Sequence, residues 1–153
     1  LLHRRPLPQL PPHRRCTVTP EKLTATLAEP AEAGVFHLPI AKAPDIAAAA
    51  RANRFRAVRI DLADCEDKDA VLSAVAAALE FPDWFGHNWD ALADCLTDLS
   101  WSEASGYVLV FSGTGNFAGT APDDFDTLIE ILSQASASWG QLGVPFWAFV
   151  LEP

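Results

Sequence analysis

Three aspartates recur at every fourth position in one segment of the chain, at Asp90, Asp94 and Asp98. This spacing places them along one side of a helix, and like charges four residues apart destabilise an isolated helix by about 0.2–0.5 kcal/mol per pair. No Lys or Arg in the segment relieves this repulsion. The pattern is typical of a solvated acidic face or of a helix that receives cations from a partner. The apolar residues recur at steps of three and four and predict the buried side: Trp89, Leu92, Leu96 and Leu99.

The residues before this helix are suited to a tight turn that carries two aromatic rings. Gly86 permits the turn, and Asn88 is a good N-cap for the helix. Trp84 and Phe85 precede the turn. They are either plugs in the core or anchors that contact a partner, since aromatic residues are enriched among the residues that dominate binding at interfaces.

Charge is distributed unevenly along the chain. The formal net charge is −9, and every Lys and Arg lies at or before Lys68. Residues 69–153 contain 12 of the 20 acids and no Lys or Arg. A field of one sign speeds association with oppositely charged partners and repels nucleic acid. We therefore expect a basic partner and no direct binding of nucleic acid.

The same residues do not predict catalytic or metal-binding chemistry. Carboxylates spaced at i, i+4 and i+8 do not converge on one divalent ion. His37 and His87 form no evident nucleophile–base pair with Cys95, which is expected between the acidic and the buried sides of the helix. Residues 113–115 resemble a phosphate-binding loop but lack the Lys that follows one. We therefore expect no enzyme activity, no metal and no cofactor. The cysteines match no zinc pattern and are expected to be reduced, in or near a core: Cys16, Cys65 and Cys95.

Strands and helices alternate along the chain, which predicts an α/β domain with a mostly parallel sheet and right-handed crossovers. Residues 107–111 are an unbroken apolar run, the pattern of a strand buried on both faces. Residues 35–38 are expected to form an edge strand, and residues 113–122 a loop. The expected strands are residues 34–40, 55–62, 107–111 and 145–151; the expected helices are residues 45–52, 67–80, 88–99 and 123–138, with one more that has Thr19 as N-cap and ends before Pro30.

The chain divides into three parts. Residues 1–18 are basic and rich in proline, and are expected to form a flexible arm. Residues 19–54 are expected to be an extension of helix, strand and helix that widens the sheet or covers one of its faces, and residues 55–153 the main domain. The start lacks the apolar stretch of a secretory signal, and no run reaches the roughly 18 residues of a transmembrane helix. We therefore expect a cytoplasmic protein without membrane contact.

The segment FPDWFGHNWDALADCLTDL, residues 81–99, resembles the central loop and inhibitory helix of the barstar family. The family pattern is an apolar residue, Pro, an acid, two aromatics, Gly, any residue, Asn, an apolar residue, Asp-Ala-Leu, any residue and Asp-Cys-Leu-Thr. All of it is present, without gaps, in residues 81–97. A weaker similarity covers residues 55–152, and residues 1–54 lie outside it.

This resemblance implies an intracellular inhibitor that plugs the active site of a ribonuclease, with acidic side chains in the place of substrate phosphate. It implies a small parallel sheet packed with helices, to which residues 19–54 add a strand–helix unit. The expected partner is a basic, extracellular-type ribonuclease, and the free inhibitor is expected to be monomeric. The contacts carried over by matching positions are Trp84, Asn88, Trp89, Asp90 and Asp94.

Two positions depart from the family pattern. Ala93 stands where the family has an aromatic residue, and Gln134, or less well Glu130, stands where the family has a glutamate on a later helix. These departures keep open an alternative target, such as another basic toxin that this chain neutralises as an immunity protein or antitoxin, and a role as a regulatory binding module. The full set of expected partner-facing residues is Trp84, Phe85, Asn88, Trp89, Asp90, Ala93, Asp94, Asp98 and Gln134.

Overall fold

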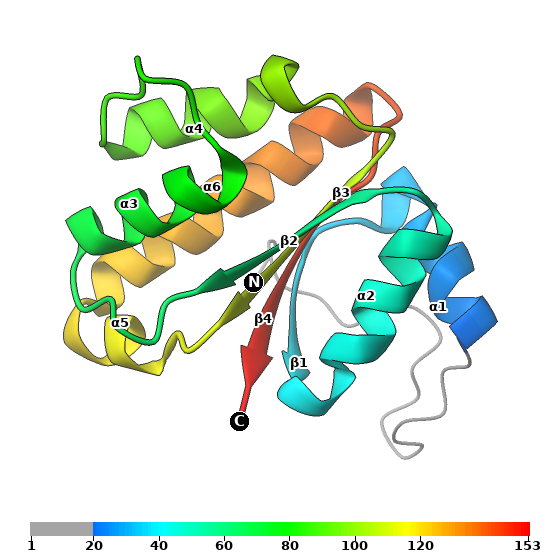
Figure 1. Ribbon diagram of the computed structural model, residues 1–153, viewed down its shortest axis with the longest axis horizontal. Helices are drawn as coiled ribbons and strands as arrows, with labels where there is room; N and C mark the ends of the chain where they lie inside the picture. The colour runs from blue at the N-terminus through cyan, green and yellow to red at the C-terminus, as the bar shows by residue number, and fades with distance from the viewer. Residues whose placement is uncertain (1–19) are drawn as a thin grey trace.

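The structure, a computed structural model, describes residues 20–153. The expected arm, the N-cap at Thr19 and Cys16 lie outside the described residues. Four parallel strands form one sheet in the order β1-β4-β3-β2 (Figure 1), which confirms the expected α/β class. The strands are β1 (Val35–Pro39), β2 (Arg56–Asp61), β3 (Tyr107–Ser112) and β4 (Phe146–Glu152).

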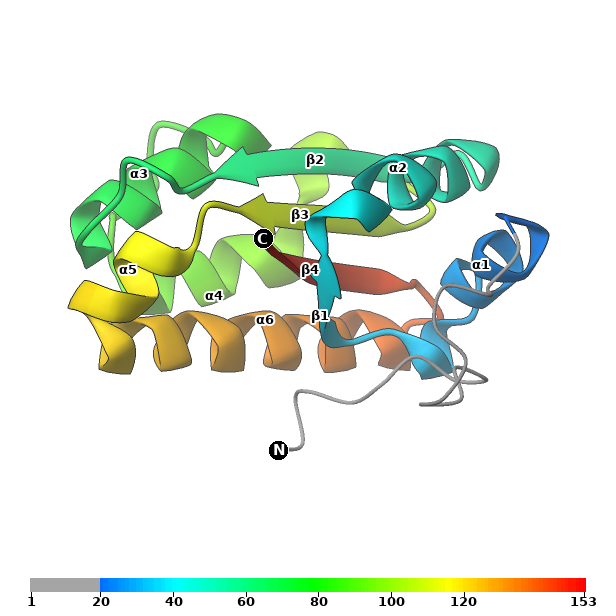
Figure 2. The same cartoon turned by 90° about the horizontal axis from the view of Figure 1, so that it is seen from below.

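Helices cover both faces of this sheet. The helices are α1 (Pro20–Leu27), α2 (Ala43–Ala52), α3 (Lys68–Leu79), α4 (Trp89–Asp98), α5 (Gly115–Thr120) and α6 (Pro122–Gln141). In Figures 1 and 2, α1 and α2 lie on one side of the sheet, and α3, α4 and α6 lie on the other. The chain crosses the whole sheet from β1 to β2 and then returns through β3 to β4. Because crossovers between parallel strands are right-handed, this reversal puts the later helices on the opposite face from α2.

Alternation along the two central strands produces a core on each face. Successive side chains of a strand point to opposite sides, so an apolar run such as β3 contributes to both cores. The larger core, under α3, α4 and α6, receives Tyr107, Leu109, Phe111, Phe146, Ala148 and Val150. The smaller core, under α1 and α2, receives Val108, Val110, Trp147, Phe149 and Leu151.

The N-terminal extension both widens the sheet and covers a face of it. Strand β1 lies at an edge of the sheet, as expected, and pairs there with β4. Its Phe36 ring lies 5.4 Å from the Trp147 ring, centroid to centroid, and the Trp147 Nε1 donates a hydrogen bond to the Leu27 carbonyl at 2.9 Å. Residues 20–54 are therefore packed onto the same sheet as the rest of the chain.

The prediction of a loop at residues 113–122 is wrong in part, because α5 forms there. Phe117 is fully buried and anchors the short helix. Its polar side chains also reach neighbouring backbone: Asn116 Nδ2 donates to the Ala63 carbonyl at 2.8 Å. A Cβ at Gly113, whose φ is +66°, would lie 2.7 Å from the Ala63 nitrogen, so the approach requires glycine. These tertiary contacts override the poor helix propensity of the segment.

Candidate partner-binding surface

The junction between the central loop and α4 is fixed by Asn88. Asn88 has extended backbone and its Oδ1 accepts a hydrogen bond from the Ala91 N–H at 2.7 Å, which is the N-cap geometry that the sequence predicts. Its Nδ2 donates to the Gly86 carbonyl at 3.2 Å. One side chain thus ties the loop to the first turn of the helix. His87, which lies between Gly86 and Asn88, adopts a left-handed backbone conformation with φ +52°.

Helix α4 packs against the core with one side and exposes its aspartates to solvent on the other. Leu92, Cys95 and Leu96 are fully buried, and Asp90, Asp94 and Asp98 are exposed. At 100° per residue, Asp90 and Asp94 each lie about 160° around the helix from Leu92, and Asp98 turns about 40° beyond Asp94. The acidic stripe therefore faces away from the core for two turns and then drifts toward one side.

Cys95 lies in the core rather than between the acidic and buried sides of α4, where the sequence analysis put it. It is about 60° from Leu92 and about 40° from Leu99, so it falls within the buried stripe. Burial raises the pKa of its thiol, and the charges of Asp94 and Asp98 raise it further. Cys65 is also free and buried, which confirms the expected state of these two cysteines.

The two loop aromatics occupy opposite environments. The Trp84 side chain is 64% exposed, and the Phe85 side chain is 7% exposed. Phe85 packs against Phe81, with ring centroids 4.9 Å apart. The expectation that Phe85 faces a partner is therefore not supported by its position, because its ring fills the core under the loop.

The remaining expected contact residues lie on or beside α4. Trp89 and Ala93 are half-buried at the edge of the core. Gln134 is exposed on α6, the helix against which α4 packs. The Trp139 Nε1 of α6 donates to the Leu96 carbonyl at 2.7 Å and joins the two helices. The structure thus brings the loop, α4 and α6 to one side of the sheet (Figure 1).

Within the described residues, the Lys and Arg side chains lie on different elements from the proposed partner-binding surface. The Lys and Arg residues from residue 20 onward lie on α1, on α2 and the segments on either side of it, on β2 and at the start of α3. Helices α4 and α6 carry acids and no Lys or Arg. Neither of the ion pairs found in residues 20–153, His37–Glu152 and Arg56–Glu80, involves α4. In that part of the chain no group of three or more His, Cys, Asp or Glu side chains is arranged to hold a metal ion.

A family model described as Barstar (barnase inhibitor) matches residues 55–151, which is more than half of the chain. The chain belongs to the barstar family. The chain is 32% identical over 82 residues to a protein of Bacillus subtilis (strain 168) that is provisionally named ribonuclease inhibitor YrdF. The aligned residues make up 52% of this chain and 85% of that protein. Members of the barstar family are inhibitors and not enzymes, and membership supports a role like that of barnase inhibitors.

The barstar match begins one residue before β2. It therefore contains β2, β3, all of β4 but its last residue, and α3 to α6, and with them the whole loop and acidic helix. Strand β1 and helices α1 and α2 lie outside the matched residues but pack onto the same sheet. No helix within residues 20–153 has the length and apolar character needed to span a membrane.

Sequence reasoning missed the residues that lie beside the end of α4. Asp98 shares a pocket with Glu103 of the following loop and with Trp139 of α6. Trp139 is 41 positions from Asp98, and no spacing or motif connects them. The one available signal was a tryptophan just after the helix expected at residues 123–138, and that signal does not identify a neighbour.

Proposed function

We propose that this barstar-family chain inhibits a basic ribonuclease by placing the acidic side of α4 in the active site of the enzyme. One observation carries the proposal. Asp90 and Asp94 project into solvent from a helix whose other side is fully buried, and neither belongs to an ion pair within the described residues. These carboxylates are positioned for cations that residues 20–153 do not supply.

The chemistry of a ribonuclease active site complements this arrangement. Such a site gathers Lys, Arg or His side chains to hold the phosphate of RNA, and carboxylates on α4 would take the place of that phosphate. Because α4 is capped and packed before binding, the inhibitor loses little conformational entropy when the complex forms. The one-sign field of α4 and α6 also speeds the encounter with a basic enzyme.

Loop residues extend the proposed contact beyond charge. Trp84 presents a large exposed ring beside the N-terminus of α4, and exposed tryptophans are frequent anchors of interfaces. Asn88 acts in the proposal mainly as the residue that fixes the angle between this loop and the helix.

A second candidate keeps the same surface but changes the target to another basic toxin. It is favoured by Ala93, which offers only a methyl group where the family has an aromatic ring, and by Gln134, which is neutral where the family has a glutamate. Both changes lie on the α4–α6 side of the molecule and would leave space for a partner of different shape. The acidic residues of α4 are common to both candidates.

Inhibition of RNA cleavage tests the proposal. Purified chain is added to barnase, and to other basic microbial nucleases, with a fluorogenic oligonucleotide as substrate. We expect stoichiometric inhibition of at least one enzyme, and a loss of apparent affinity when a nucleoside 3′-phosphate occupies its active site. The uncharged nucleoside is the matched control for the phosphate. Failure to inhibit any of these nucleases, or inhibition that the nucleotide does not weaken, would contradict an active-site plug.

A further inference from the structure

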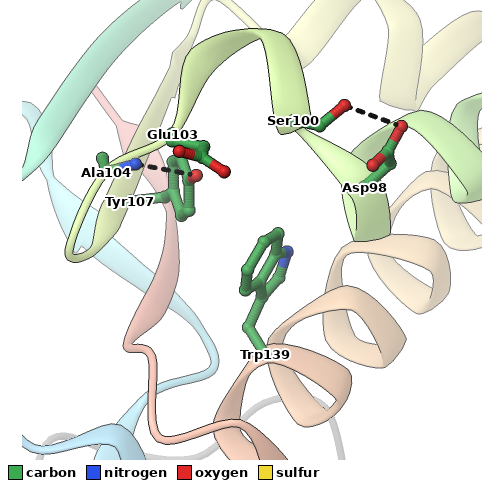
Figure 3. A pocket seen from close by; sticks show the side chains of 6 residues that line it. All are labelled: Asp98, Ser100, Glu103, Ala104, Tyr107 and Trp139. Carbon is green, nitrogen blue, oxygen red and sulfur yellow. Dashed lines mark hydrogen bonds between the residues drawn. The ribbon is translucent and has the colours of Figure 1, made fainter.

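A pocket of about 600 Å³ lies at the C-terminal end of α4 (Figure 3). Four parts of the chain meet there: the last turn of α4, the loop that follows it, the start of β3 and the last turns of α6. Its lining residues are Asp98, Ser100, Glu103, Ala104, Tyr107 and Trp139. The pocket contains none of the contacts carried over from the family pattern, and of the full set of expected partner-facing residues it contains only Asp98.

Two aromatic rings form the apolar part of the pocket, and their polar atoms are already bonded. The Trp139 Nε1 donates to the Leu96 carbonyl at 2.7 Å. The Tyr107 hydroxyl donates to the Ser102 carbonyl and accepts from the Ala104 N–H, both at 3.1 Å. The two ring centroids are 5.2 Å apart. Tyr107 is buried in the larger core and Trp139 is half-buried, so the pocket offers a ligand mainly the π-surface of the Trp139 indole.

The charged part of the pocket is two carboxylates. Figure 3 shows Asp98 and Glu103 on opposite sides of the space above the Trp139 ring. Asp98 accepts a hydrogen bond from the Ser100 hydroxyl at 3.3 Å, and neither carboxylate belongs to an ion pair within residues 20–153. Burial raises the pKa of the Tyr107 hydroxyl, and the nearby positive charge of Arg56 offsets part of this rise. The Arg56 guanidinium forms its ion pair with Glu80, at 3.9 Å.

We propose that this pocket receives a cationic side chain of the partner, and an arginine in preference to a lysine. A guanidinium is planar and weakly hydrated, so it can stack on an indole while its N–H groups reach carboxylates at its edges. The two carboxylates belong to no group of three or more His, Cys, Asp or Glu side chains that is arranged to hold a metal ion within the described residues. The combination of an aromatic surface with acids on either side therefore favours an organic cation.

The pocket extends the proposed inhibitory surface by one helical turn. Asp98 follows Asp94 by four residues, a rise of about 6 Å along the helix. An enzyme that covers Asp90 and Asp94 thus brings its own surface to the mouth of the pocket. That the arginine belongs to a basic ribonuclease rests on the proposed function, whereas the preference of the pocket for a guanidinium does not.

The test is a titration of the whole chain, labelled with nitrogen-15, with Nα-acetyl-arginine amide and no nuclease present. The readout is the indole N–H signal of Trp139 in the nuclear magnetic resonance spectrum. Nα-acetyl-citrulline amide has the same shape without the charge, and Nα-acetyl-lysine amide has the charge without the plane. We expect a saturable shift with the arginine compound, a weaker response to the lysine compound and none to the citrulline compound.

Three variants separate the pocket from general charge. Glu103→Gln and Asp98→Asn should each raise the dissociation constant of the arginine compound about two- to fivefold, the range expected for one partly exposed charge contact. Glu66→Gln removes the same charge from an exposed position near the other end of the sheet and should leave the constant unchanged.

The proposal is overturned if the Trp139 signal does not move, if citrulline shifts it as much as arginine does, or if Glu66→Gln weakens binding as much as Glu103→Gln. Because the titration contains no nuclease, these outcomes leave the proposed inhibition by α4 untouched. If Asp94→Ala abolishes inhibition but still binds the arginine compound, the pocket binds guanidinium independently of the helix surface, which supports the proposal.

Discussion

Trp84 and Phe85 are adjacent in the sequence, yet one is 64% and the other 7% exposed. Phe85→Ala should lower the free energy of unfolding by about 3–5 kcal/mol, because it empties a packed site in the core. Trp84→Ala should cost well under about 1 kcal/mol of stability, as surface substitutions do, and should instead weaken inhibition by more than about 1 kcal/mol. Urea unfolding and inhibition titrations measure the two effects. Equal destabilisation by both variants would contradict this division of roles.

The different environments of these two rings could not be predicted from the sequence. In a helix, a period of 3.6 residues separates the buried from the exposed side, and the exposure of Asp90 and Asp94 follows from it. A loop has no such period, so two neighbouring aromatics remain equivalent until the tertiary contacts of Phe85 with Phe81 are known.

The N-cap is the element-scale feature that links stability with binding. Asn88 caps α4, and Asp67 caps α3 in the same way by accepting from the Ala70 N–H at 2.9 Å. Asn88→Ala and Asp67→Ala should each lower the free energy of unfolding by about 1 kcal/mol. Only Asn88→Ala should also weaken inhibition, because it loosens the loop that positions Trp84 and the start of α4.

Thermal unfolding and inhibition titrations of the two variants test this expectation, with Asp67→Ala as the matched control for a lost cap. If both variants weaken inhibition to the same extent, the effect is one of general stability and not of α4.

Most elements were predictable because each carries a strong local signal. The helices at residues 67–80 and 88–99 combine a cap with an apolar period, and the observed α3 and α4 differ from the predictions by one residue at each end. The segment of α5 has no such signal. Its sequence, GNFAGT, is poor in helix formers. Burial of Phe117 in the core holds it, together with the hydrogen bond from Asn116 to Ala63, 53 positions earlier in the chain.

At the scale of the whole molecule, the extension and the barstar part share one sheet. We therefore expect Leu27→Ala, at a fully buried side chain in the last turn of α1, to lower the stability of the fold by about 2–5 kcal/mol in one cooperative transition. Leu142→Ala, at a side chain that is 73% exposed, is the control and should change stability by no more than about 0.5 kcal/mol. Two separate transitions in calorimetry would mean that residues 20–54 form an independent unit.

Strand alternation predicts the class of the fold, but not its detailed arrangement. The edge position of β1 was expected, whereas its pairing with β4 rather than with β2 is a consequence of packing on both faces of the sheet. The pocket at Asp98 and Trp139 shows the same limit, because it depends on how α6 crosses the end of α4. The uneven distribution of charge along the chain could be predicted in full, since it is read directly from the order of the residues.

The central claim, that α4 is a specific plug, is tested most directly by the dissociation rate of the complex with the inhibited nuclease in about 0.15 M salt, where exposed charges are largely screened beyond about 8 Å. Asp94→Ala should raise this rate most, with a cost of about 2–5 kcal/mol, the range for truncating one partner of a buried charge pair, a rule for which barnase–barstar itself is a worked example. Asp90→Ala should raise it less. Asp123→Ala, at an exposed position on α6, should change mainly the association rate and its salt dependence. Equal losses of affinity in all three variants, erased by added salt, would contradict a specific plug and leave only a diffuse acidic surface.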